Sequence, residues 1–124
     1  MSDSIHRLFA SVLAARELDP AISRTAKLFR NGVQKMVKKL IEESIEVGLE
    51  AVQMNREAAI LESADVLYQL AVVWAECGIT PAEVFDEIDR RERLYGIAEK
   101  LPKQASAAQA RRLSSQPSGR KAAF

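Results

Sequence analysis

The sequence predicts an all-α fold, a bundle of four or five helices. The 124 residues suffice for one ordinary domain, and they include only five glycines and four prolines, the commonest turn-forming residues. Aromatic residues, which favour strands, make up only 6% of the chain. Apolar residues recur at the i, i+3, i+4 spacing of one helix face along most of the chain before Pro102.

The first helix is predicted to begin near Asp3 or Ser4 and to end at Asp19-Pro20, because a residue that precedes proline is disfavoured in a helix. Its apolar side is formed by Ile5, Leu8, Phe9, Val12 and Leu13. We expect a short irregular segment through Ser23–Leu28, followed by a break near Asn31-Gly32.

Two long helices and a shorter one are predicted next. The first should run from about Val33 to about Met54, and the second from about Arg56 to Cys77. Asn55 can cap the start of the second, and Gly78 is a typical left-handed terminator. In Thr80-Pro81-Ala82-Glu83, the threonine and glutamate form a capping box that starts the last helix. Because the link at Asn55 is short, the two long helices should form a central antiparallel hairpin.

The carboxyl end differs in composition from the rest of the chain. The net charge is only +1, but every charged residue after Glu99 is basic. Beyond Pro102 the residues are mostly Ala, Ser, Gln and Arg without sustained apolar periodicity. We therefore expect one domain over residues 1–101 and a basic, flexible tail over residues 102–124.

The stretch Ala58–Ala75 is apolar nearly all the way round and is almost long enough to cross a bilayer. Glu62 and Asp65 lie inside it, and acids in a membrane cost roughly 2.5 kcal/mol or more each. A buried helix of a soluble protein is the better interpretation. Because one short chain cannot easily surround such a helix, we expect a homodimer, with larger assemblies left open, whose interface includes Trp74.

Other features exclude several classes of protein. Cys77 is the single cysteine, so no intrachain disulfide can form, which suits a reducing cytoplasm. The amino terminus has no signal-peptide pattern. His6 is the only histidine, which argues against nucleophilic thiol catalysis, and no glycine-rich phosphate loop is present.

Four or five carboxylates are expected to converge between the two hairpin helices. Glu42, Glu43 and Glu46 fall within one sector of about 100° on the first helix, and Glu62 and Asp65 lie one turn apart on the second. Oxygen ligands without histidine or cysteine select Mg²⁺, Mn²⁺ or Ca²⁺ over zinc. Two alternatives stay open: the first three acids could form a solvated helix face, and buried basic residues could pair with the other two.

Lysines precede these acids on the same helix. In two possible i, i+4 ion pairs, Lys38–Glu42 and Lys39–Glu43, the lysine precedes the glutamate, which is the less favourable order. Stabilisation of the helix by ion pairs therefore explains these lysines poorly. Near a metal cluster they could hold the phosphates of a substrate, although solvated surface lysines remain an alternative.

The acids also carry a resemblance. Glu43-Ser44-Ile45-Glu46 and Glu62-Ser63-Ala64-Asp65 match the ExxE…ExxD signature of the all-α, MazG-like nucleotide pyrophosphohydrolases. The segment Ser23-Arg24-Thr25-Ala26-Lys27-Leu28 and the region around Cys77–Arg91 extend the likeness, which is closest to the phosphoribosyl-ATP pyrophosphohydrolases of histidine biosynthesis. Arg24 stands where a tyrosine or tryptophan is common, and Ile41 where many relatives have glycine.

The resemblance implies Mg²⁺-dependent hydrolysis of phosphoribosyl-ATP to phosphoribosyl-AMP and pyrophosphate. It implies that the metal is held by Glu43, Glu46, Glu62 and Asp65, and that Glu42 or Glu43 accepts a proton from water. It further implies that the phosphates are steadied by Lys27, Lys38 and Lys39. The alternatives are a housekeeping pyrophosphohydrolase for another nucleotide and a non-catalytic helical dimer that binds a partner or nucleic acid. We expect a cytoplasmic enzyme without membrane or nucleic-acid partners.

Overall fold

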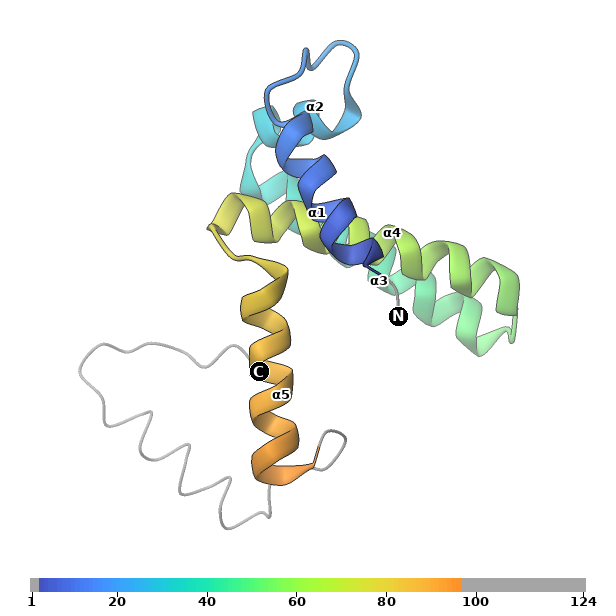
Figure 1. Ribbon diagram of the computed structural model, residues 1–124. Helices are drawn as coiled ribbons and strands as arrows, with labels where there is room; N and C mark the ends of the chain where they lie inside the picture. The colour runs from blue at the N-terminus through green and yellow to red at the C-terminus, as the bar shows by residue number, and fades with distance from the viewer. Residues whose placement is uncertain (1–2, 97–124) are drawn as a thin grey trace, which may run out of the picture. The chain divides into compact units, whose positions relative to one another are not determined.

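Five helices make up the part of the chain that the computed structural model describes, residues 3–96 (Figure 1). Their bounds are α1 Ser4–Ala15, α2 Arg24–Asn31, α3 Val33–Val52, α4 Arg56–Cys77 and α5 Pro81–Tyr95. Within residues 3–96 there is no strand, which confirms the all-α prediction. The chain divides into two units, Met1–Phe85 and Asp86–Phe124, and the expected tail at 102–124 lies outside the described residues.

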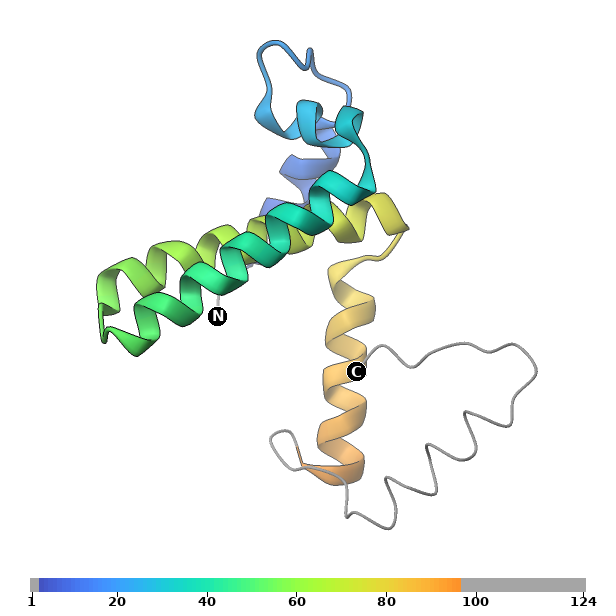
Figure 2. The ribbon, with the colours of Figure 1, turned by 180° about the vertical axis from the view of Figure 1, so that it is seen from behind.

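The central antiparallel hairpin is confirmed. Helices α3 and α4 lie side by side along their length in both views (Figures 1 and 2). The side chain of Asn55 accepts a hydrogen bond from the Ala58 N–H, as expected of a helix cap. At its other end α4 stops at Gly78, whose φ of 70° is left-handed.

Helix α2 corrects the prediction of an irregular segment. The Ser23 hydroxyl accepts the Ala26 N–H at 3.1 Å and so begins a helix of eight residues. The break expected near Asn31-Gly32 falls at Gly32. Gly32, at φ 93°, ends α2 and precedes α3 in a conformation that residues other than glycine rarely adopt.

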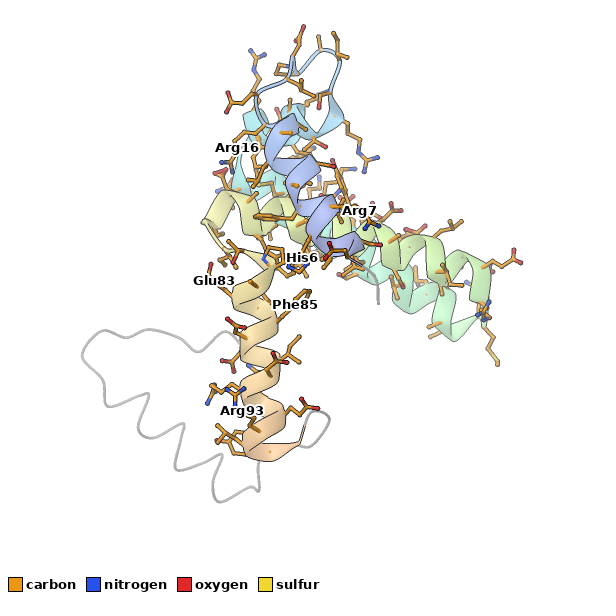
Figure 3. All side chains as sticks on the ribbon, in the orientation of Figure 1. His6, Arg7, Arg16, Glu83, Phe85 and Arg93 are labelled. Carbon is orange, nitrogen blue, oxygen red and sulfur yellow. The ribbon has the colours of Figure 1, made fainter. Side chains whose placement is uncertain are left out.

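The core lies under the carboxyl-terminal half of α4. Its members come from the first four helices, α1 to α4: Val12, Leu28, Met36, Ala71, Val72 and Ala75. Arg16, just after α1, joins three of these helices (Figure 3). Its guanidinium donates to the Ala75 carbonyl at 2.7 Å and lies 4.5 Å from the centroid of the Phe29 ring. The same side chain therefore satisfies a terminal carbonyl of α4 and makes a cation–π contact with α2.

Burial along α4 differs from the sequence prediction. Trp74, which we expected at a dimer interface, is only 8% exposed within its own chain. The large apolar residues of α4 that are exposed are Ile60 and Leu61 near its start and Leu67 near its middle. A longer apolar strip lies on α3, where the following residues are 41% to 83% exposed: Val37, Ile41, Ile45, Leu49 and Val52. We call these five residues the α3 strip.

Helix α4 is long and apolar enough to cross a membrane by length and composition alone. Such a helix is also common in the core of soluble proteins, and the carboxyl-terminal half of α4 is buried in this way. Two acids, Glu62 and Asp65, lie in the same helix, so burial in a soluble fold remains the better interpretation.

Helix α5 begins as predicted. Thr80 and Glu83 form the capping box, with the Thr80 N–H donating to Glu83 Oε1 at 3.0 Å and the Glu83 N–H donating to Thr80 Oγ1 at 3.3 Å. The His6 and Phe85 rings meet edge to face with centroids 5.6 Å apart (Figure 3). Farther along α5, hydrogen bonds from Arg90 and Arg91 lower the pKa of Glu87 to about 2.

Candidate active site

Three carboxylates meet between the hairpin helices. Glu43 comes from α3, and Glu62 and Asp65 come from adjacent turns of α4. One oxygen of each lies within 4.8 Å of the others, and all three side chains are half-buried. The antiparallel pairing of α3 and α4 produces this meeting, because it brings the middle of one helix beside the middle of the other.

The electrostatics of this cluster favour a bound cation. The pKa of Glu62 is raised, first by a hydrogen bond with Glu43, then by desolvation, and then by repulsion from Glu43, Asp65 and Glu46. A raised carboxyl pKa means that the site resists a further negative charge. Oxygen-only ligands at this spacing fit a hard divalent cation, and the donor set lacks the nitrogen and sulfur atoms that zinc prefers.

The remaining predicted acids lie near the cluster but outside it. Glu46 is exposed and close enough to raise the pKa of Glu62. Glu42 is also exposed, and its Oε2 lies 3.9 Å from the Lys39 ammonium. The structure therefore brings Glu43, Glu62 and Asp65 together, with Glu46 beside them and Glu42 facing a lysine.

The three predicted lysines occupy two places. Lys38 is exposed on α3, one residue before the half-buried Lys39. Lys27 lies on α2 and lines a separate cavity with Arg24 and Arg30. Sequence reasoning treated these lysines as a single phosphate-binding group, whereas two helices present them.

Tyr68 and its neighbours connect α2 to the acidic helix, a feature that sequence reasoning missed. The Tyr68 and Thr25 hydroxyls are 2.5 Å apart, and the Arg24 guanidinium lies 5.0 Å from the centroid of the Tyr68 ring. Tyr68 is three residues after Asp65, so it lies on the same side of α4 as that carboxylate. That spacing was the available signal, but nothing local indicated that α2 would pack there.

The serines inside the acidic motifs have a structural explanation. Ser44 donates to the Leu40 carbonyl at 2.8 Å, and Ser63 donates to the Ala59 carbonyl at 2.6 Å. Each hydroxyl is thus bonded to its own helix. The motif chemistry therefore rests on the carboxylates.

Comparison with known proteins gives a consistent result. A family described as phosphoribosyl-ATP pyrophosphohydrolase matches residues 6–92. A Rhodopseudomonas palustris protein named phosphoribosyl-ATP pyrophosphatase 2 is 62% identical over 103 residues, which cover 83% of this chain and 79% of the relative. A Bradyrhizobium diazoefficiens protein of the same name is 58% identical over 105 residues, covering 85% and 78%. An Azospirillum brasilense phosphoribosyl-ATP pyrophosphatase is 46% identical over 96 residues, covering 77% and 86%.

Proposed function

Since this chain belongs to the phosphoribosyl-ATP pyrophosphohydrolase family, we propose that it hydrolyses phosphoribosyl-ATP to phosphoribosyl-AMP and pyrophosphate in histidine biosynthesis. One observation carries the chemistry: carboxylates from two helices meet between them, at Glu43, Glu62 and Asp65. A triphosphate and a carboxylate cluster repel each other unless a cation lies between them. The arrangement therefore suits metal-assisted hydrolysis of a phosphoanhydride.

The metal ligands in this proposal are Glu43, Glu46, Glu62 and Asp65, and the ion is Mg²⁺, with Mn²⁺ as an alternative. When bound, the ion neutralises charge on the phosphates and lowers the pKa of a coordinated water. The hairpin fixes the carboxylates on two rigid helices, which limits the rearrangement needed to bind a cation.

Proton transfer is assigned to Glu42 or Glu43. A water oxygen bonds to the α-phosphorus of the triphosphate. The bond between this phosphorus and the oxygen that bridges it to the β-phosphorus breaks, and pyrophosphate leaves. The water's proton passes to a carboxylate Oε atom of one of these residues. Glu42 is a suitable acceptor because it lies outside the cluster of Glu43, Glu62 and Asp65. Its Oε2 atom is 3.9 Å from the Lys39 ammonium, which orients the carboxylate.

The positive side chains hold the phosphates. Lys38 and Lys39 lie on the helix that carries Glu43, within about two turns of it. Lys27 supplies a further positive charge from α2. An ammonium group is a mobile point charge, which suits an anion that moves during the reaction.

The protein is proposed to act as a homodimer in the cytoplasm. The α3 strip, together with Leu67, exposes apolar surface that a second copy would cover. Four members of the strip are about 100° or more from both Glu43 and Glu46 around the helix, whereas Leu49 is about 60° from Glu46. Pairing through the strip would leave Glu43 accessible to substrate.

A pyrophosphate-release assay tests the proposed function. The purified chain with Mg²⁺ is offered phosphoribosyl-ATP beside a panel of ordinary nucleoside triphosphates. Turnover of phosphoribosyl-ATP, abolished in Asp65→Asn and retained in the exposed control Glu17→Gln, supports the proposal. Turnover of a different triphosphate alone would assign another substrate, and no turnover of any would leave a non-catalytic protein.

A further inference from the structure

A cavity of about 650 Å³ lies beside α2, apart from the carboxylate cluster. Its lining includes Pro20, Ile22, Arg24, Lys27, Arg30 and Asn31. The three cationic residues follow each other at intervals of three along α2, so they occupy one sector of about 120°. We call this feature the α2 pocket; its volume is within the usual range of small-ligand sites.

The positive charges of the α2 pocket are not neutralised by the part of the chain described here. Within residues 3–96, neither Lys27 nor Arg30 has a carboxylate within ion-pair distance. The nearest acid in sequence, Asp19, uses its Oδ1 to accept the Ala21 N–H at 2.9 Å and so stabilises the loop. The three cations around this cavity would repel each other less with an anion between them.

The α2 pocket also has an apolar wall. Ile22 is 86% exposed and lies with Pro20 on the loop before α2. A site for inorganic anions alone needs no such surface. Cations beside apolar carbon suit a phosphate that is attached to an organic group, such as a sugar phosphate.

A short chain of contacts joins the α2 pocket to the acids. The Arg24 guanidinium stacks on the Tyr68 ring at 5.0 Å, and Thr25 bonds the same tyrosine's hydroxyl. Tyr68 follows Asp65 by three residues, a rise of about 4.5 Å along α4. One aromatic side chain and one helical turn therefore separate the two sites, a span that a nucleotide-sized ligand can bridge.

We propose that the α2 pocket binds the phosphate of the substrate's phosphoribosyl group through Arg24, Lys27 and Arg30. This inference rests on the proposed function. The substrate carries phosphate at two ends, a triphosphate and a single phosphate on the added ribose. The carboxylate cluster handles the triphosphate only with a cation, and it offers nothing to a remote phosphomonoester. The α2 pocket supplies the missing positive charge and makes this chain distinguish its substrate from ATP.

Binding of ribose 5-phosphate tests the α2 pocket without turnover. An NMR titration of the full chain, in EDTA to keep the carboxylates free of metal, should shift amide signals of Ile22 and Arg30. Arg30→Gln and Lys27→Gln should each weaken binding about tenfold or more, because a charged hydrogen bond to phosphate is lost. The control Arg7→Gln, on the exposed face of α1, should leave binding unchanged. Unaltered binding in both pocket variants, or no binding to the wild-type chain, overturns the inference.

Kinetics provide an independent readout. Arg30→Gln should raise KM for phosphoribosyl-ATP about tenfold to a hundredfold and leave kcat within about twofold, because the phosphate is bound equally in ground and transition states. A fall in kcat at unchanged KM overturns the assignment. Tripolyphosphate titrated in EDTA separates the two ends of the substrate. If it occupies the α2 pocket more tightly than ribose 5-phosphate, the pocket holds the triphosphate and the inference is wrong. A wild-type chain that binds ribose 5-phosphate in the pocket but never turns over phosphoribosyl-ATP refutes the proposed function alone.

Discussion

Glu62 is the residue on which metal binding and stability meet. Its carboxyl is surrounded by those of Glu43, Asp65 and Glu46, and its pKa is raised above the ordinary value of 4.5. The folded chain therefore holds this proton more tightly than the unfolded chain does. In the absence of metal, the contribution of Glu62 to stability is present at acidic pH and is lost as the pH rises through the raised pKa.

Replacing Glu62 by glutamine should separate these effects. In EDTA at pH 7, Glu62→Gln should melt at a higher temperature than the wild-type chain, because one repelling charge is removed. This advantage should shrink as the pH is lowered through the raised pKa of Glu62, because the wild-type carboxyl then becomes protonated in the folded chain. Adding Mg²⁺ should raise the melting temperature of the wild-type chain and not that of the variant.

Thermal melts with Mg²⁺ and with EDTA, from pH 4 to pH 8, provide the measurement. Glu17→Gln is the matched control, since Glu17 is exposed and lies outside the cluster. A variant that gains as much from Mg²⁺ as the wild-type chain would remove Glu62 from the metal site.

Gln69 presents a different conflict at the same scale. Its side chain is fully buried, and neither its Oε1 nor its Nε2 has a hydrogen-bond partner among the described residues. A buried amide that is left unsatisfied costs about 1–3 kcal/mol. Nothing in the local sequence predicts this position, because a single glutamine in an apolar helix is equally compatible with an exposed side chain.

Gln69→Met should therefore stabilise the chain by about 1–2 kcal/mol, since methionine has a similar shape and needs no partner. Urea unfolding followed by circular dichroism measures the change. The exposed Gln53→Met serves as the control and should differ from wild type by less than about 0.5 kcal/mol. A loss of stability in Gln69→Met would show that the amide is hydrogen-bonded in the working protein.

Helix ends illustrate what could be predicted at the scale of an element. Asn55, Gly78 and the Thr80–Glu83 capping box were all read correctly, because a cap depends on residues within one turn. Helix α2 was missed because its eight residues have few apolar positions and too little length to show a period. Its only local signal was Ser23, which sequence reasoning did not use.

The two ends of the hairpin helices share one backbone motif with different residues. After α4, the Ile79 N–H donates a hydrogen bond to the Trp74 carbonyl, and the Gly78 N–H donates one to the Ala75 carbonyl. After α3, the Asn55 N–H bonds the Glu50 carbonyl and the Met54 N–H bonds that of Ala51. Both are Schellman caps, but the left-handed residue is glycine in the first and methionine, at φ 58°, in the second.

Met54→Gly should stabilise the hairpin by about 0.5–1 kcal/mol. A left-handed conformation costs an L-residue about 1–2 kcal/mol, and glycine relieves it at some cost in unfolded-state entropy. Little burial is lost, because the Met54 side chain is 88% exposed. Gln53→Gly is the matched control: Gln53 has right-handed φ and ψ, so glycine there should destabilise. Chemical unfolding measures both variants, and a destabilised Met54→Gly would indicate that the methionine is buried in an assembly.

At the scale of the whole molecule, the sequence did not indicate which apolar residues are buried within one chain and which remain exposed. An apolar circumference of α4 suggested an interface at Trp74, but the fold covers that side chain within the chain. The largest group of exposed apolar residues lies on α3, and its position depends on which face of α3 packs against α4. That choice is tertiary, so periodicity alone does not determine it.

The α3 strip should therefore carry the dimer contact. Fully burying one such side chain contributes about 1.5–3 kcal/mol, so five of them exposed would cost a small domain much of its margin. Ile45, in the middle of the strip, is the residue to change. Ile45→Glu would bury an unpaired charge in the interface and should convert a dimer into a monomer. Trp74→Glu is unsuitable, since a charge at that core position would unfold the chain.

Light scattering with size-exclusion chromatography decides between the two states. At micromolar concentration the wild-type protein should have twice the 13.7 kDa mass of one chain, and Ile45→Glu should have the mass of a single chain. Ser11→Glu, which places the same charge on an exposed position of α1, should remain dimeric. If hydrolysis requires the second copy, activity should fall with the dimer and recover as the concentration of the variant is raised. A wild-type chain that is monomeric and active at these concentrations would contradict the assembly, and the α3 strip would then need another partner.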